Sequence, residues 1–358
     1  MIHISDSDLA LLKSETKIGE SLGKLTEEQL EVIYRNRLFN MFVPEEYGGH
    51  GLNLVEGLLL EEQLARIDGS LGWTITFGAG ANMFVGYLDS FLAKMIFQDK
   101  KVCFGGSAML DGIAKEVKDG YIINGSWKHI VGITHSTILT ANCHIERDGE
   151  LLFDDKGAPI YESFFFFPRE ISIVKDWKTM GLEASGSHSF KVVNLKVNKN
   201  RVFVIQSDKR VIDSTMYKFP FAQFAILTLT ANHLGMQEHF LEELKRFFDG
   251  EIQNQFFKFK DELYYNYLDK FNARREQFYD LAQKAWDEVG SNGVMSEATE
   301  EKIDVLCKAL VHKGRASILN VMPYLGIYAV TGANEMNKII RDILTASQFS
   351  MLLPDSLE

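Results

Sequence analysis

The segment DWKTMGLEASGSHSFKVVNLKVNKNRVF (176–203) places a tryptophan and a turn rich in Gly and Ser directly before a strand pattern. In its second half apolar residues alternate with polar ones, which predicts a half-buried β-strand. The apolar positions are Val193, Leu195 and Val197, interleaved with Asn194, Lys196 and Asn198. An upstream segment, YIINGSWKHIVGITHS (121–136), again combines a Trp with turns that contain Gly and Ser. The two segments therefore indicate a β region in the middle of the chain.

Turn signals and a continuous apolar run support this β region. Asp119-Gly120 and Asn124-Gly125 are predicted turn elements of a hairpin, and SFFFF (163–167) predicts a strand buried on both faces. Before and after the region, apolar residues recur with helical spacing. After it, the expected helices cover about 213–249, 256–289, 297–322 and 334–352. We therefore expect an α+β multidomain protein with an N-terminal helical domain (1–100), a middle β domain built as a barrel or sandwich (101–205) and a C-terminal four-helix bundle (206–358).

Two local pairings are predicted in the N-terminal domain. Thr26 and Gln29 have the spacing of a capping box at a helix start. Glu62 falls on the apolar stripe of a helix over about 54–67. It is either a buried acid or, as its spacing to Arg66 favours, part of an ion pair within one helix.

Composition excludes several classes of protein. The 358 residues are 46% hydrophobic and carry a formal net charge of -11, which argues against nucleic-acid binding and against a disordered chain. The N-terminus lacks the pattern of a secretory signal, and no apolar run has the length of a membrane helix. The three cysteines have neither disulfide-framework nor metal-ligand spacing. We expect a cytoplasmic protein without a metal site.

Familiar catalytic motifs are missing from the sequence. It contains no GxSxG, HExxH, Walker loop or GxGxxG after a strand. The nine histidines are dispersed, although His129 and His135 lie close together in the β region. Backbone N–H groups, hydroxyls and a flat aromatic face, as the two Trp-containing segments offer, suit a planar cofactor such as a flavin. The alternative is that Trp127 and Trp177 are core rings.

Five segments, in order, resemble the acyl-CoA dehydrogenase superfamily of flavoproteins over nearly the whole chain. They are PEEYGGHG with EEQLARIDGSLGW (44–51, 61–73), YIINGSWKHIVG (121–132), DWKTMGLEASGS (176–187), HLGMQEHFLEEL (233–244) and KIIRDILTASQ (338–348). The residues in these segments are more similar to the branch that contains two-component flavin monooxygenases of the hydroxyphenylacetate and dibenzothiophene type. The resemblance implies the three-domain fold expected above, a homotetramer or homodimer, and FAD, or FMN, between the β domain and the bundle.

The resemblance also implies which residues face the flavin. The matching positions are Trp127, His129, Val131, Gly132, Trp177, Ser185 and Ser187, with weaker matches at Phe104, Gly106 and Ser107. His129 and Val131 replace the Trp and Thr of the dehydrogenases, so a backbone N–H would substitute for the Thr hydroxyl near flavin N5. Arg246 partly matches the Arg that binds the FAD of a neighbouring subunit, although Asp249 breaks that motif.

The catalytic positions depart from the family pattern. The two positions at which dehydrogenases carry their catalytic Glu read Ser350 and Ala225, and the His typical of the monooxygenase branch is replaced by Phe349. His129 and Ser350 remain the candidate catalytic residues. Abstraction of an α-proton needs a base such as a carboxylate, and none is identified.

Three functions stay open at this point. The first is a flavin-dependent oxidoreductase acting on the CH–CH bond of an acyl thioester, with an electron-transfer flavoprotein as partner. The second is a two-component monooxygenase that uses reduced flavin from a separate flavin reductase on a small molecule. The third is a catalytically degenerate member that serves as a binding or scaffold subunit.

Overall fold

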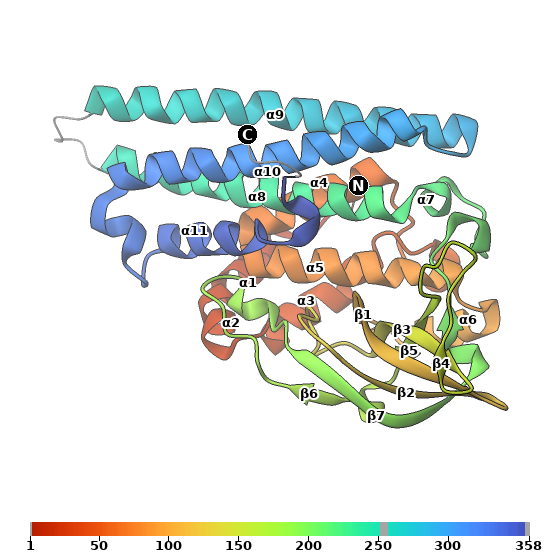
Figure 1. Ribbon diagram of the computed structural model, residues 1–358. Coiled ribbons are helices and arrows are strands. Elements are labelled where there is room, and N and C mark those ends of the chain that lie inside the picture. The colour runs from red at the N-terminus through yellow and green to blue at the C-terminus, as the bar shows by residue number, and fades with distance from the viewer. Residues whose placement is uncertain (1, 251–256, 355–358) are drawn as a thin grey trace.

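The computed structural model describes residues 2–250 and 257–354. Three predicted boundaries lie outside the described residues. They are the start of the first domain at Met1, the start of a bundle helix at Phe256 and the end of the last domain at Glu358. The elements follow the predicted order of helices, then strands, then helices (Figure 1).

Within the described residues, six α-helices precede the sheet. They are α1 (Asp6–Ser14), α2 (Thr16–Leu22), α3 (Glu27–Arg35), α4 (Leu54–Ile67), α5 (Gly69–Asn82) and α6 (Ser90–Phe97). The predicted capping box is confirmed, because the Thr26 hydroxyl accepts from the Gln29 N–H and the Gln29 side chain accepts from the Thr26 N–H. Asp68 caps α5 through its side chain, so it fixes the direction of the chain between α4 and α5.

The strands form one mixed sheet in the order β6-β7-β2-β1-β3-β5-β8, with β4 paired to β3. They are β1 (Phe104–Val117), β2 (Gly120–Trp127), β3 (Ile138–Arg147), β4 (Glu150–Leu151), β5 (Tyr161–Phe166), β6 (Ser172–Val174), β7 (Ser189–Asn198) and β8 (Val202–Phe203). Strands β1 and β3 are parallel, and the other pairs are antiparallel. Phe164, Phe165 and Phe166 are all buried, which confirms a strand covered on both faces.

Asn124-Gly125 is not a turn, contrary to the sequence prediction. Both residues lie inside β2, where Gly125 pairs with Gly112 of β1. A Cβ atom at either glycine would overlap the indole of Trp127. These glycines therefore make room for a core ring, whereas the predicted turn near Asp119-Gly120 is present between β1 and β2.

Val193 is exposed, although the alternating pattern predicts it to be half-buried with Leu195 and Val197. The register between β2 and β7 shifts here, so Val193 and Asn194 together face Asn124. Asn194 has a left-handed backbone with φ of 50°, and its N–H donates to the Asn124 side chain at 2.8 Å. This bulge turns Val193 outward, because an extra residue reverses the alternation of a strand.

The C-terminal helices are α7 (Thr215–Lys218), α8 (Phe221–Gly250), α9 (Phe257–Asn292), α10 (Glu297–Leu325) and α11 (Glu335–Ala346). The predicted 213–249 helix is broken at Pro220, which lies between α7 and α8. The sheet forms one side of the molecule and α9 the opposite side, with α5 and α8 between them (Figure 1). Within the described ranges, no helix combines the length and apolar character that crossing a bilayer requires.

Candidate functional site

Two segments that lie far apart in the sequence are joined by backbone hydrogen bonds next to the sheet. The Ile130 N–H donates to the His188 carbonyl and the Gly132 N–H to the Ser185 carbonyl, each at 2.9 Å. We call residues 129–132 the left-handed turn, because His129 has φ of 61° and Gly132 has φ of 68°. These hydrogen bonds hold the two Trp-containing segments side by side.

Gly132 is required by the shape of this turn. Its backbone is left-handed, and a Cβ atom there would lie 2.7 Å from two atoms of the His135 ring. The His135 ring stacks on Phe39 with centroids 5.5 Å apart, and burial lowers the pKa of His135 to about 4. The His135 ring is therefore neutral at physiological pH, and it packs against the left-handed turn at Gly132.

The backbone N–H of Val131 is free within the part of the chain that the structure describes. No hydrogen bond from it is found there, whereas Ile130 and Gly132 on either side both donate to carbonyls of the 185–188 segment. The Val131 side chain is half-buried. Among the described residues the His129 N–H likewise has no hydrogen bond, so the turn offers two backbone donors for a ligand, and the Val131 N–H lies between the two that are used.

The hydroxyls of Ser185 and Ser187 are used inside the protein. Both side chains are buried, and their oxygens lie 2.7 Å apart. The Ser185 hydroxyl donates to the Leu182 carbonyl at 2.6 Å. The two serines therefore fix the conformation of the 182–188 segment, which in turn holds the turn at 129–132.

Trp177 and His129 form the outer edge of this region. The Trp177 indole N–H donates to the Leu182 carbonyl at 3.0 Å, and the ring is half-buried. The exposed His129 ring meets it edge-on, with centroids 5.7 Å apart. Both rings belong to one wall beside the left-handed turn.

Trp127 lies elsewhere, in the core of the sheet. Its ring is fully buried, stacks on Phe190 at 5.0 Å and donates to the Asn142 carbonyl at 3.1 Å. The interpretation of Trp127 as a core ring is thus confirmed. The ring has no face toward the turn at 129–132 that a cofactor could contact.

Residues 104–107 reach the left-handed turn through the backbone at the start of β1. A Cβ atom at Gly105 would lie 3.2 Å from Ile130 and 2.5 Å from the Ser136 hydroxyl. Phe104 is buried, and a side chain at Gly106 would overlap Thr140. Ser107 is half-buried, and its hydroxyl accepts from the Met109 N–H.

Three aromatic side chains meet between α5 and the end of α11. We call Trp73, Phe77 and Phe349 the aromatic wall. The Phe349 ring meets Trp73 and Phe77 edge-on, at 5.9 and 5.5 Å. Their helix also touches the left-handed turn, because Thr74 lies 3.4 Å from a Cβ built at Gly132. The sequence interpretation missed Trp73 and Phe77, although the motif EEQLARIDGSLGW ends at Trp73.

The remaining predicted residues are not brought to the turn by contacts of the described chain. Arg246 is exposed on α8 and pairs with Glu243. Ser350 is exposed and begins a short turn directly after Phe349, and Ala225 is half-buried on α8. Neither position carries a carboxylate, as the sequence already indicates.

The predicted Glu62–Arg66 pair is wrong. Glu62 is buried and instead accepts both guanidinium hydrogen bonds of Arg275 on α9, at 2.6 and 2.8 Å, and the Tyr279 hydroxyl at 2.6 Å. Arg66 pairs with Glu238 and Glu242 of α8. Helical spacing permits the local pair, but tertiary partners from the bundle displace it.

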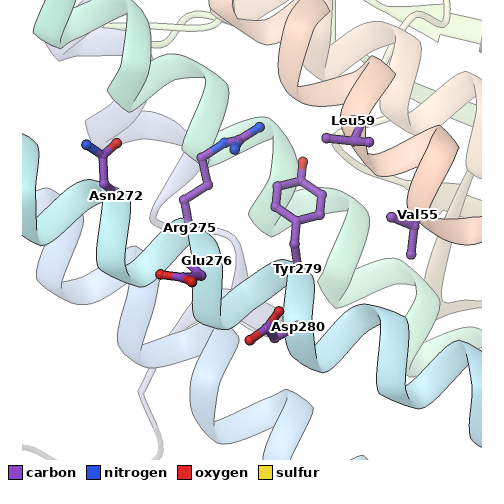
Figure 2. A pocket seen from close by; sticks show the side chains of 7 residues that line it. All are labelled: Val55, Leu59, Asn272, Arg275, Glu276, Tyr279 and Asp280. Carbon is purple, nitrogen blue, oxygen red and sulfur yellow. The ribbon is translucent and has the colours of Figure 1, made fainter.

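A pocket between α4 and α9 lies next to this buried pair. It is lined by Val55, Leu59, Asn272, Arg275, Glu276, Tyr279 and Asp280. Figure 2 shows Arg275 and Tyr279 reaching toward α4, whereas Glu276 and Asp280 point away from it. None of the residues predicted to face a flavin lines the pocket, so it is separate from the left-handed turn.

Glu61 gives a prediction about pH and stability. It is fully buried on α4, and neither carboxylate oxygen has a hydrogen-bond partner among the described residues. Burial raises its pKa well above the ordinary value. Between the ordinary and the raised pKa the folded state keeps a proton that the unfolded chain releases, so stability falls as pH rises. In this pH window we expect the free energy of unfolding of Glu61→Gln to rise relative to that of the wild type by up to about 1.4 kcal/mol per pH unit.

Urea unfolding at pH 5 and pH 8 checks this expectation, with Glu301→Gln, at an exposed position on α10, as the control. A wild-type-minus-variant difference that does not change with pH would show that Glu61 titrates normally.

Comparison with known proteins shows which proteins the chain is similar to. The model of the acyl-CoA dehydrogenase N-terminal domain matches residues 16–91. An indole-3-acetate monooxygenase of Acinetobacter baumannii is 24% identical over 343 residues, which are 92% of this chain and 84% of that protein. The oxygenase subunit HsaA of a flavin-dependent monooxygenase from Rhodococcus jostii is 22% identical over 240 residues, 64% of this chain and only 61% of its own length.

Solved structures have the same fold. The HsaA monooxygenase of M. tuberculosis superposes with a TM-score of 0.89 at 17% identity, covering 98% of this chain and 92% of its own. XiaF from Streptomyces sp., solved with FADH2 and glycerol, superposes with a TM-score of 0.87 at 16% identity, covering 97% and 90%.

Proposed function

We infer that the chain is a member of the acyl-CoA dehydrogenase superfamily. We propose that it is the oxygenase component of a two-component flavin-dependent monooxygenase acting on a small aromatic molecule. The observation that carries the proposal is the likeness to an indole-3-acetate monooxygenase over 92% of the chain. The aromatic wall supports it, because flat apolar rings suit a flat apolar substrate.

In this proposal the left-handed turn is the place of the flavin ring. Val131 offers a free backbone N–H, Gly132 supplies the left-handed backbone of the turn, and Trp177 with His129 bounds the outer edge. This arrangement supports the predicted substitution of a backbone donor for the missing Thr hydroxyl near N5. FAD is our first choice, since XiaF was solved with FADH2, and FMN is the alternative.

A bound reduced flavin would supply the two electrons with which O2 is split, one oxygen atom entering the substrate and the other leaving as water. In this proposal the chain contributes binding and exclusion of water. The Val131 N–H would orient the flavin, and the half-buried Phe77 and Phe349, packed on the buried Trp73, would hold the substrate ring in a dry environment. A separate flavin reductase, the expected partner, would supply the reduced flavin. A homotetramer or homodimer and a cytoplasmic location remain predictions.

Dehydrogenation of an acyl thioester gains no support at the positions that would carry it. The reaction needs a base for the α-proton, and the two positions hold an exposed serine, Ser350, and the methyl group of Ala225. Butyryl-CoA with an artificial electron acceptor is therefore expected to give no turnover.

The test supplies the purified protein with FAD or FMN, a flavin reductase, NADH and ¹⁸O2, and offers indole-3-acetate or p-hydroxyphenylacetate as substrate. We expect one ¹⁸O atom in the product, detected by mass spectrometry, and none when the protein is left out. Turnover of butyryl-CoA would restore the dehydrogenase hypothesis. Failure to bind either flavin would favour the scaffold hypothesis.

Gly132→Ala tests the turn itself. The new methyl group would require a left-handed alanine and would meet the His135 ring, so we expect flavin affinity to fall at least tenfold. Flavin fluorescence titration measures the dissociation constant. Gly80→Ala on α5 is the matched control, because a Cβ there makes only an ordinary 3.6 Å contact with Phe224. Equal flavin affinity in both variants would remove the turn from the proposed site.

A further inference from the structure

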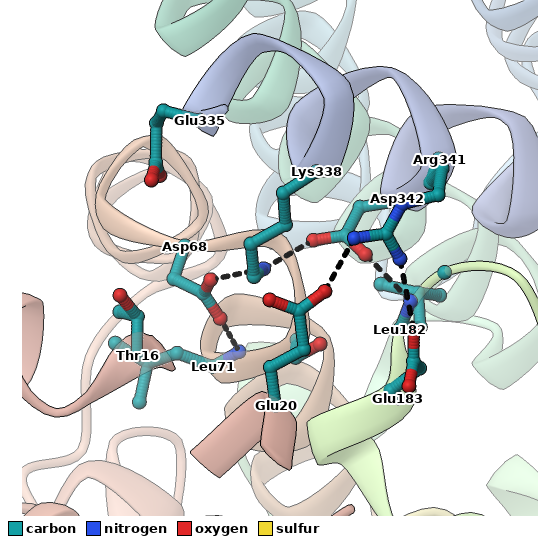
Figure 3. A network of polar contacts seen from close by, with 12 residues as sticks. Thr16, Glu20, Asp68, Leu71, Leu182, Glu183, Glu335, Lys338, Arg341 and Asp342 are labelled. Carbon is teal, nitrogen blue, oxygen red and sulfur yellow. Dashed lines mark hydrogen bonds and ion pairs between the residues drawn. The ribbon is translucent and has the colours of Figure 1, made fainter. Parts of the chain in front are cut away.

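Three charged side chains form a buried triad at the junction of α5 and α11 (Figure 3). Asp68, Lys338 and Asp342 are each at most 4% exposed. The Lys338 ammonium donates to a carboxylate oxygen of Asp68 and, at 2.6 Å, to one of Asp342. Because charges are expensive to bury, a gain in stability does not by itself account for such a triad.

The second oxygen of each carboxylate binds a backbone N–H. Asp68 Oδ1 accepts from Leu71 in the first turn of α5, at 2.8 Å. Asp342 Oδ1 accepts from Leu182 at 2.6 Å. Through Lys338 the triad therefore connects α5, which carries Trp73 and Phe77 of the aromatic wall, with the loop ahead of Ser185.

Leu182 is the residue on which this loop turns. It is buried and has a left-handed backbone with φ of 54°, a conformation that is rare for a bulky side chain and costs energy. Its N–H binds Asp342, while its carbonyl accepts from both the Trp177 indole and the Ser185 hydroxyl. The conformation of Leu182 thus fixes the Trp177 ring and the segment that holds the left-handed turn.

Helix α11 also contacts the loop on either side of Leu182. Arg341 donates to the Met180 carbonyl and pairs with Glu183 and with Glu20 of α2 (Figure 3). Gly181 lies so close to α11 that a Cβ would be 2.6 Å from the Asp342 nitrogen. These contacts hold residues 180–183 against α11 at Arg341. They therefore fix the position of the Asp342 carboxylate relative to the Leu182 N–H.

We propose that Asp342, oriented by Lys338, is a positioning residue of the flavin site, which acts by holding Leu182 in its left-handed conformation. The inference rests on the proposed function, since it assigns a flavin to the left-handed turn. Asp342 touches neither the flavin nor the substrate in this scheme. It acts through Leu182, Trp177 and Ser185.

The test compares Asp342→Ala with Asp342→Asn in the full-length chain. Alanine removes the acceptor for the Leu182 N–H, whereas asparagine keeps an oxygen there. We expect FAD and FMN dissociation constants to rise at least tenfold in the alanine variant and less than threefold in the asparagine variant. The visible circular dichroism of bound flavin should weaken in the same order. Glu20→Gln, which removes a different partner of α11, is the control and should bind flavin as the wild type does.

Hydrogen exchange of residues 176–188 in flavin-free protein tests the same idea without any cofactor. We expect exchange in Asp342→Ala to be at least tenfold faster in this segment and unchanged in β1 and α8. If the wild type binds no flavin, the proposed function fails while this measurement still decides the positioning role. Unchanged exchange and flavin affinity in Asp342→Ala, or equally faster exchange throughout the chain, would overturn the inference.

Discussion

Replacing Lys338 by methionine is expected to lower the free energy of unfolding by about 3–5 kcal/mol, because it leaves the carboxylates of Asp68 and Asp342 buried without a cation. Methionine is close to lysine in length and keeps the packing of the stem. The loss therefore reports the charge and not a cavity. Urea unfolding of the wild type and Lys338→Met at pH 7 measures it.

The pH dependence of this loss has a definite sign. The neighbouring carboxylates outweigh burial and raise the pKa of Lys338, so its contribution is fully present below its ordinary pKa and declines only in alkaline solution. In Lys338→Met the two unpaired carboxyls should bind protons more readily, so the deficit should shrink as pH falls. A triple variant with Asp68→Asn and Asp342→Asn should recover much of the loss. A deficit of under 1 kcal/mol at pH 7 in Lys338→Met would contradict the account.

The order of the elements is predictable from the sequence, because hydrophobic spacing is a local property. The same holds for the Thr26–Gln29 capping box, whose partners are three residues apart. Local spacing fails where a residue chooses between a near partner and a distant one. Glu62 has Arg66 one turn away, yet it pairs with Arg275, which lies more than two hundred residues later and reaches it across a helix interface.

The candidate site was predictable in its segments but not in the role of each side chain. The two Trp-containing segments do meet, and Trp177 does border the left-handed turn. Trp127, in a similar sequence setting, fills the sheet core instead, because Gly112 and Gly125 leave space for its ring. The space that two glycines on adjacent strands create depends on strand register, which spacing along one segment does not specify.

The buried triad was not predicted either, for a related reason. Lys338 and Asp342 have helical spacing and occur within the motif KIIRDILTASQ, which indicates an ordinary surface pair. Their burial depends on Asp68, which belongs to another helix, and on Leu182, whose left-handed backbone has no signal in the sequence. Only the assembled fold turns a common ion pair into a link between two parts of the site.

Gly181→Ala is expected to have the second large effect on stability and flavin affinity. Gly181 is the point at which the 180–183 loop approaches α11 most closely, and the substitution would separate the two. The added methyl group would overlap the carbonyl group of Arg341 and lie 2.6 Å from the nitrogen of Asp342, and all of these atoms belong to the backbone of α11. No side chain can rotate away, so residues 180–182 must move off the helix. Overpacking of this kind costs about 1–3 kcal/mol, and loss of the Leu182–Asp342 hydrogen bond about 1.5–3 kcal/mol more.

We therefore expect Gly181→Ala to lose about 3–5 kcal/mol of unfolding free energy and at least tenfold in flavin affinity, measured by urea unfolding and by fluorescence titration. Gly80→Ala, the same exchange within helix α5, is expected to be neutral or to gain up to about 1 kcal/mol. The two readouts separate the roles of the contact. A large loss of stability with unchanged flavin affinity would make Gly181 a packing residue alone, since the loop would then tolerate displacement from α11 without disturbing the left-handed turn.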